Sequence, residues 1–182
     1  MQETDPGLIR AAIAGDVDAF EQIVRLHQQS VWRYLRRLLG DPAAAEDVAQ
    51  ETFLRVYRRL PTYAFRSRFS TWLFQIARNA GLDELRSRAR DERTRRAVRP
   101  VPATADGPAT ARVEIDAALA TLPVDQREAL LLVEVLGLRY AEAAVVLAVP
   151  VGTVKSRVFG ARVRLAAWAD AGQDREEAGD EM

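Results

Sequence analysis

The sequence contains no cysteine and only one histidine among its 182 residues. Without cysteine there are no disulfide bonds, no thiolate metal ligands and no cysteine nucleophile. The single histidine, His27, has no second imidazole with which to build a metal site or an acid–base pair. Runs of about 18 apolar residues are also missing, and the segment MQETDPGLIR lacks the basic and apolar regions of a signal peptide. We therefore expect a cytoplasmic protein with no cofactor, no metal and no membrane span.

Aromatic residues are scarce as well, at 7% of the sequence, whereas 48% of the residues are hydrophobic. Many of these hydrophobic residues are alanine and leucine, which favour helices, and the chain is long enough to bury one or two small cores. No strand alternation and no internal repeat is visible. The sequence therefore predicts an all-α fold.

Net charge is absent, because 26 basic residues balance 26 acidic ones. The charges are unevenly distributed, however: residues 1–99 hold 18 of the basic and 13 of the acidic residues. In the remainder, acidic residues gather in the tail DREEAGDEM and basic ones follow Pro150. Every basic residue except Lys155 is an arginine, whose planar guanidinium suits phosphates and guanine edges. A GC-rich genome is the alternative source of this bias.

Helical spacing of apolar residues predicts a first helix between Asp16, its N-cap, and Gly40, where it ends. His27 lies on the apolar stripe of this helix, so we interpret it as a buried packing residue. The stripe consists of Val17, Phe20, Val24, Val31, Leu35 and Leu38.

Two more helices are predicted before residue 91. Asp41 and Pro42 are suited to the N-cap and first position of a helix that Pro61 closes. Its inward residues are Ala45, Val48, Thr52, Val56 and Leu60. After a loop, Ser70 is the expected N-cap of a long third helix, STWLFQIARNAGLDELRSRAR.

The segment RPVPATADGPATA is rich in Pro, Ala, Gly and Thr and has no apolar face, which is typical of a linker. We therefore predict two small helical domains, over residues 1–91 and 112–170, joined by a flexible linker over 92–111 and followed by an acidic tail over 171–182. Helical segments are expected over 112–121, 123–136, 139–147 and 151–169.

The last two of these segments have helix-turn-helix spacing, with Ala148, Val149 and Pro150 as the break and small Ala144 permitting close approach. The second helix should bury Val151, Val154, Val158, Ala161, Leu165 and Trp168. It should expose Thr153, Lys155, Ser156, Arg157, Phe159 and Arg162, with Arg164 adding to its basic character. A helix with this exposed polar start can enter the major groove of DNA. A solvated basic face on a bundle helix is the alternative.

Three stretches resemble bacterial sigma-70-family initiation factors. LPVDQREALLLVEVLGLRYAEAAVVLAVPVGTVKSRVFGARVRL resembles their region 4 domain, and DPAAAEDVAQETFLRVYRRL followed by RFSTWLFQIARNAGLDELR resembles region 2. With a short linker between them, the chain resembles the two-domain extracytoplasmic-function (ECF) subfamily over about residues 7–168. It departs from the family at Ala148, where many members have glycine. If this residue is left-handed, alanine costs about 1 kcal/mol.

The resemblance implies that AEDVAQETFLRVYRR docks on the clamp coiled coil of the largest RNA polymerase subunit, and that the flap region is a second polymerase contact. The exposed Leu54, surrounded by charges, suits a small hot spot with a polar rim. An ordinary amphipathic surface is the alternative. The candidate polymerase-binding residues, all off the buried stripe, are Asp47, Gln50, Glu51, Leu54, Arg55 and Arg58.

Between Phe65 and Arg88, arginines that suit phosphates, Arg78 among them, accompany aromatic rings on which unpaired bases can stack. The resemblance implies that the loop Pro61–Phe69 captures a base flipped from the −10 promoter element. Phe69 continues an apolar stripe and Trp72 lies beside it, so a core role stays open for both. The candidate −10 residues are Phe65, Arg66, Arg68, Phe69, Trp72, Asn79, Arg86 and Arg88; the −35 candidates are the six exposed residues of the last helix.

No catalytic arrangement is visible. The acidic pairs Glu46-Asp47 and Asp83-Glu84 are adjacent in sequence and face different directions on a helix. We therefore predict a non-enzymatic sigma subunit that binds core RNA polymerase and promoter DNA, both duplex and single-stranded, and assists strand opening. The alternatives are a helix-turn-helix regulator that binds duplex DNA without polymerase, and a protein-interaction module without DNA binding. An anti-sigma factor or self-masking between the two domains would keep the free chain inactive.

Overall fold

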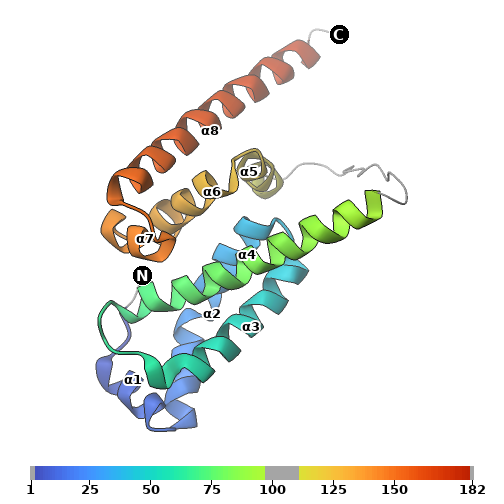
Figure 1. Cartoon of the computed structure of the whole chain (residues 1–182). Helices are drawn as coiled ribbons and strands as arrows, with labels where there is room; N and C mark the ends of the chain where they lie inside the picture. The colour runs from blue at the N-terminus through green and yellow to red at the C-terminus, as the bar shows by residue number, and fades with distance from the viewer. Residues whose placement is uncertain (1–2, 97–110, 181–182) are drawn as a thin grey trace. The chain divides into compact units, whose positions relative to one another are not determined.

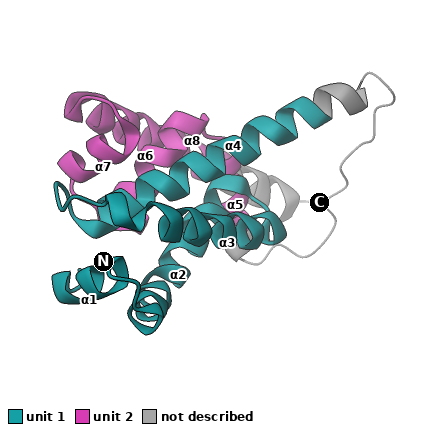
Figure 2. Cartoon of the chain, turned by 60° about the horizontal axis from the view of Figure 1, so that its bottom comes forward, with its two compact units in different colours: residues 1–107 teal, residues 108–182 magenta. Residues whose placement is uncertain are grey.

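The computed structural model describes residues 3–96 and 111–180, and the side chains of residues 3–91 and 114–171. These residues form helices and no strand (Figure 1), so the all-α prediction is confirmed. The chain divides into two compact units, residues 1–107 and residues 108–182 (Figure 2). Of the linker predicted over 92–111, residues 92–96 belong instead to the last helix of unit 1 and residue 111 to the first helix of unit 2, and the rest lies outside the described residues.

The described part of unit 1 contains the helices α1 (Pro6–Ile13), α2 (Val17–Leu39), α3 (Pro42–Arg59) and α4 (Phe69–Arg96). A 3-10 turn, η1 (Leu60–Thr62), follows α3. Helices α2, α3 and α4 pack pairwise against one another, and α1 packs against α2 and η1. The fully buried side chains of this unit include Ile23, Tyr34, Leu35, Leu38, Leu73 and Phe74.

The helix ends follow from local side-chain chemistry. The Asp16 carboxylate accepts a hydrogen bond from the Ala19 amide at 3.0 Å, and the Asp41 carboxylate accepts from the amides of Ala43 and Ala44. Gly40 ends α2 with φ of 70°, a left-handed conformation that glycine adopts without a steric cost. The predicted caps at these three positions are confirmed.

His27 is 1% exposed, which confirms its predicted burial. Its Nε2 lies 2.6 Å from Thr4 Oγ1, and its ring centroid lies 5.7 Å from that of Phe69.

Two other predictions in this unit are wrong. Val17, predicted to lie on the buried stripe, is 65% exposed because it is the first residue of α2 and no other described element packs over it. Ser70 lies inside α4 rather than at its N-cap, and the Trp72 amide donates to the Arg68 carbonyl.

Unit 2 contains α5 (Ala111–Ala120), α6 (Val124–Leu130), the π-helical turn η2 (Leu131–Val135), α7 (Tyr140–Leu147) and α8 (Val151–Asp180). Helix α8 packs against α5, α6 and α7. Leu131, Leu132 and Val154 are among the buried residues of this unit. Val151 and Trp168 are partly exposed, contrary to prediction, because they lie at the two ends of the buried stripe of α8.

The predicted helix-turn-helix is present in α7 and α8, whose axes meet at 99°. Ala148 adopts φ of 54° and ψ of 44°, the left-handed conformation in which a side chain is strained. The Val149 amide donates to the Ala144 carbonyl at 3.1 Å, which closes the end of α7. Helix α8 continues to Asp180, past the predicted end at residue 169. Its extension runs through AGQDREEA, where most residues are good helix formers.

Within the residues described here, no single helix is both long and apolar enough to cross a membrane. The bent pair Tyr140–Leu147 and Val151–Ala171 meets that requirement only when the two helices are counted together, by length and composition.

Candidate nucleic-acid and partner interfaces

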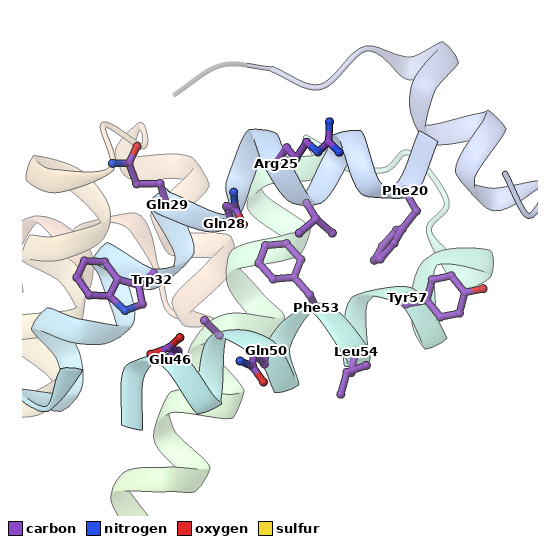
Figure 3. A pocket seen from close by; sticks show the side chains of 12 residues that line it. Phe20, Arg25, Gln28, Gln29, Trp32, Glu46, Gln50, Phe53, Leu54 and Tyr57 are labelled. Carbon is purple, nitrogen blue, oxygen red and sulfur yellow. The ribbon is translucent and has the colours of Figure 1, made fainter. Parts of the chain in front are cut away.

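An open groove lies between α2 and α3. Phe20 from α2 and Phe53 from α3 point toward the space between the two helices (Figure 3), and Trp32 also lines it. Leu54 is 52% exposed at the rim of this groove, next to the equally exposed Tyr57. The groove therefore offers an apolar floor with an exposed apolar rim.

The six residues predicted to bind polymerase divide between two sides of α3. Gln50 and Leu54 line the groove toward α2, whereas Asp47, Glu51 and Arg55 line a second hollow toward α4. Asp47, Gln50, Leu54 and Arg58 are exposed.

Glu51 and Arg55 are already engaged within unit 1. Arg55 donates to the Glu51 carboxylate at 2.8 Å and to the Asp83 carboxylate of α4 at 3.2 Å. The hydrogen bond to Glu51 raises the pKa of Arg55 against the opposing effect of burial. Arg55 therefore connects α3 to α4, which leaves the exposed side of α3 to Asp47, Gln50, Leu54 and Arg58.

An aromatic cluster holds the loop between η1 and α4. The Tyr63 ring packs against Phe65, Phe69 and Trp72, with centroid distances of 4.8, 5.5 and 5.1 Å. The Tyr63 hydroxyl donates to the Ser67 carbonyl at 2.6 Å, which ties the loop across itself. Phe65 is 43% exposed and has φ of 56°, a strained value for a residue other than glycine.

Of the two roles open for Phe69, the structure favours the core, since its ring is 3% exposed. Trp72 is half-buried at the edge of the same cluster and presents part of its ring to solvent. Arg66 and Arg68 of the loop and Asn79 of α4 are exposed. The groups that this loop region presents to solvent are therefore the rings of Phe65 and, in part, Trp72, together with the two loop arginines.

The two arginines farther along α4 differ in their surroundings. Arg86 is exposed and pairs with Asp83 at 3.1 Å. Arg88 donates to Glu84 at 2.7 Å and to Asp41, the N-cap of α3, at 2.9 Å. These bonds raise the pKa of Arg88. Arg88 therefore connects α4 to the start of α3, in addition to the DNA contact predicted for it.

On α8, the predicted DNA-facing residues Lys155, Ser156, Phe159 and Arg162 are exposed, whereas Thr153 and Arg157, also predicted to be exposed, are half-buried. Phe159 is 70% exposed, an unusual position for a large apolar ring. Arg157 and Arg162 are paired with acidic residues of neighbouring elements. Arg157 Nε lies 3.3 Å from Asp125 Oδ2 on α6, and Arg162 donates to Glu134 on η2.

Sequence reasoning missed two features of these interfaces. It did not predict α1, although Asp5 followed by Pro6 is a helix-start signal and the Asp5 carboxylate accepts from the Gly7 amide. It also missed the pairing of Arg157 and Arg162 with acidic partners, because those partners are distant in sequence and carry no local signal.

Comparison with known proteins places the chain in a family. The profile of Sigma-70 region 2 matches residues 23–91, and that of Sigma-70, region 4 matches residues 112–165. The chain is 43% identical over 177 residues to the ECF RNA polymerase sigma factor SigC of Mycobacterium tuberculosis, covering 94% of each chain. It is 31% identical over 172 residues to the ECF sigma factor SigW of Bacillus subtilis, covering 86% of this chain and 92% of SigW.

Solved structures show the same relationship. The sigma factor RpoE, in complex with the anti-sigma factor NepR from Bartonella quintana, superposes with a TM-score of 0.74 at 30% identity, over 85% of this chain and 98% of RpoE. CnrH, in complex with the cytosolic domain of CnrY, superposes with a TM-score of 0.70 at 28% identity, over 90% of this chain and 96% of CnrH. Similarity along nearly the whole chain does not favour a stand-alone regulator. The chain belongs to the ECF subfamily of sigma-70 factors, the subunits that bind core RNA polymerase and promoter DNA to start transcription.

Proposed function

We propose that three surfaces of this chain carry out its work as a sigma subunit. The docking face consists of Asp47, Gln50, Leu54 and Arg58 with the groove between α2 and α3. The strand site consists of Phe65, Arg66, Arg68 and Trp72, with Asn79 and Arg86 at its border. The recognition face consists of Thr153, Lys155, Ser156, Arg157, Phe159 and Arg162. The observation that carries the proposal is the strained, exposed Phe65 beside two exposed arginines.

The docking face fits a helical partner. The groove has an apolar floor, and the exposed Leu54 and Tyr57 at its rim would be covered by a bound helix. Polar residues around an apolar centre are the usual arrangement of a small interface. We assign this face to the clamp coiled coil of the largest polymerase subunit, and unit 2 to the flap region.

The strand site fits an unpaired base of the −10 element. Aromatic faces and cationic side chains together favour single strands over duplex, because bases in duplex DNA are already stacked. Loop strain is common at ligand-binding sites, where the ligand stabilises a conformation that is otherwise unfavourable. Phe65 has both the exposure and the strain, whereas the buried Phe69 supports the loop from below.

The recognition face fits the −35 duplex. Its exposed residues lie near the N-terminal end of α8, after the 99° bend from α7, which is the arrangement of helices that enter a major groove. Among the side chains that the structure describes, none forms an ion pair with Lys155, so its charge is directly available to phosphate or guanine.

The remaining assignments follow from the family. We expect a non-catalytic subunit that acts in the cytoplasm, where core polymerase is found. Residues 1–91 and 112–170 are the proposed domains, supported by profile matches that end at residue 91 and begin at residue 112. An anti-sigma partner is supported by the similar sigma factor RpoE, whose structure was solved in complex with the anti-sigma factor NepR.

The strand site is tested by comparing closed and pre-opened promoters. Trp72→Ala should lower transcription from a closed duplex by about fivefold or more, because the lost base stacking is worth about 1–3 kcal/mol. A template mismatched across the −10 region should be affected much less, since its bases are already unstacked. Runoff transcription with core polymerase measures both, and Trp72→Phe, which keeps an aromatic face, is the control. Equal losses on both templates would assign Trp72 to packing.

A further inference from the structure

The segment Glu3–Arg10 lies along the loop of the strand site and contacts it at several points. Glu3 Oε1 is 3.6 Å from Arg68 Nε. The guanidinium carbon of Arg10 lies 5.4 Å from the centroid of the Phe65 ring. Helix α1 also packs against η1, where the loop begins. The segment therefore contacts both an arginine, Arg68, and an aromatic residue, Phe65, of the proposed strand site.

Thr4 anchors this segment to the core. It is 4% exposed, and its Oγ1 lies 2.6 Å from Nε2 of the buried His27. His27 in turn packs against Phe69, the buried ring beneath the loop. Because Thr4 is fixed in this way, Glu3 before it and Arg10 in the helix after it are held beside the loop.

Arg10 stands over an exposed ring in a strained loop. The Phe65 ring contacts Tyr63 and has a cation over it in Arg10, whose guanidinium is attracted by the ring face. A base that stacks on Phe65 brings a phosphate of its own strand to the same region. Arg10 is exposed and long enough to turn from the ring to that phosphate, where a charge-assisted hydrogen bond replaces the weaker cation–ring contact.

Glu3 places a negative charge beside the same loop. Its carboxylate pairs with Arg68, and the pKa of Tyr63 is raised by burial and, secondarily, by the charge of Glu3. A phosphate that approaches Arg68 must therefore displace Glu3 or accept its repulsion. Glu3 and Arg10 have opposite charges, so they should affect strand binding in opposite directions.

We propose that residues 3–10 form an additional wall of the −10 strand site, in which Arg10 contacts the strand and Glu3 weakens binding by competing for Arg68. This inference rests on the proposed strand site. It assigns single-strand binding to a helix that lies outside the matched region 2, which begins at residue 23.

The test uses holoenzyme assembled from core polymerase and full-length variants. Its ligand is a fluorescent single-stranded oligonucleotide with the non-template −10 sequence, titrated at several salt concentrations. Arg10→Met keeps the aliphatic stem and removes the charge. It should weaken binding about five- to tenfold and reduce the salt slope by about 0.7, the value for one phosphate contact on a single strand. Glu3→Gln should tighten binding about two- to fivefold at low salt, the range of an exposed ion pair.

Three control variants separate the possible outcomes. Arg33→Ala removes an exposed charge of α2 and should change nothing. Thr4→Val removes the hydrogen bond to His27 without changing charge, so it shows what loosening the segment alone does to binding. If Arg10→Met and Glu3→Gln both weaken binding with an unchanged salt slope, as Thr4→Val would, the segment is only a brace and the proposal is wrong.

Arg66→Ala distinguishes failure of this inference from failure of the strand site. If Arg66→Ala weakens binding and Arg10→Met does not, the strand site stands and the additional wall is rejected. If Arg66→Ala and Trp72→Ala both leave oligonucleotide binding intact, the strand site itself is rejected, and the proposed wall with it.

Discussion

Replacing Ala148 by glycine should stabilise the helix-turn-helix of unit 2. Ala148 has a left-handed backbone, with φ of 54° and ψ of 44°, and this conformation costs an alanine about 1–2 kcal/mol. Glycine has no Cβ and adopts the conformation without that cost. The Ala148 side chain is exposed, so its removal opens no cavity in the core.

The gain is reduced by an opposing effect on the unfolded chain. Glycine has more conformational freedom there than alanine, which lowers stability by about 0.4–1 kcal/mol. The net stabilisation should therefore be about 0.5–1 kcal/mol. For a domain of this size, such a change raises the melting temperature by about 2–8 °C.

Amide hydrogen exchange of α7 and of the first turns of α8 measures this change within the full-length protein. The expected gain corresponds to about two- to fivefold slower exchange. Ala166→Gly is the matched control: Ala166 is exposed and lies within right-handed α8, so the same substitution should lower stability there by about 0.5–1 kcal/mol. Faster exchange in both variants would refute the inference that the turn is strained by its side chain.

Three further predictions concern the other surfaces and the core. Leu54→Glu should weaken association with core polymerase by several kcal/mol because it would bury a charge at the docking face. Leu26→Glu, a change at a similarly exposed residue outside the groove, should not, and titration of labelled protein with core polymerase compares the two. Lys155→Ala should weaken −35 duplex binding, either lowering the salt slope by about 1 or relaxing sequence preference, as titrations on two sequences would show. Burial lowers the pKa of His27 in the folded protein, so the unfolded chain binds a proton more readily than the folded chain does. The free energy of unfolding should therefore fall as the pH drops below about 6.5, by at most about 1.4 kcal/mol per pH unit. Denaturation between pH 7.5 and 5.5 measures this fall, and His27→Gln should flatten it.

Local chemistry explains which parts of the fold were predictable from the sequence. Asp16, Gly40 and Asp41 act on amides or backbone angles within a few residues, so their capping roles follow from sequence alone. The end of the loop before α4 was not predictable in this way. Ser70 is a good N-cap by type, but burial of Phe69 and the Tyr63 hydrogen bond to Ser67 draw the helix start forward to Phe69.

Periodicity predicted which residues face solvent better than it predicted what they contact. Leu54 and Lys155 are exposed, as their positions off the buried stripes of their helices indicate. The acidic partner of Arg157 lies 32 residues away on α6, and one partner of Arg88 lies 47 residues away at the start of α3. Such pairs depend on how helices pack, which no local pattern specifies.

These ion pairs change what a count of basic residues implies for DNA binding. Counterion release occurs when a basic side chain neutralises a DNA phosphate and displaces the cations condensed on it, so a side chain already paired within the protein must give up that pair to contribute fully. Arg157 is held by Asp125, and its side chain is 24% exposed, so part of its charge is compensated before DNA arrives. Lys155 is exposed on the same turn of α8. Lys155 should therefore contribute more to the salt dependence of −35 binding than Arg157, although arginine is the better ligand for phosphate and guanine.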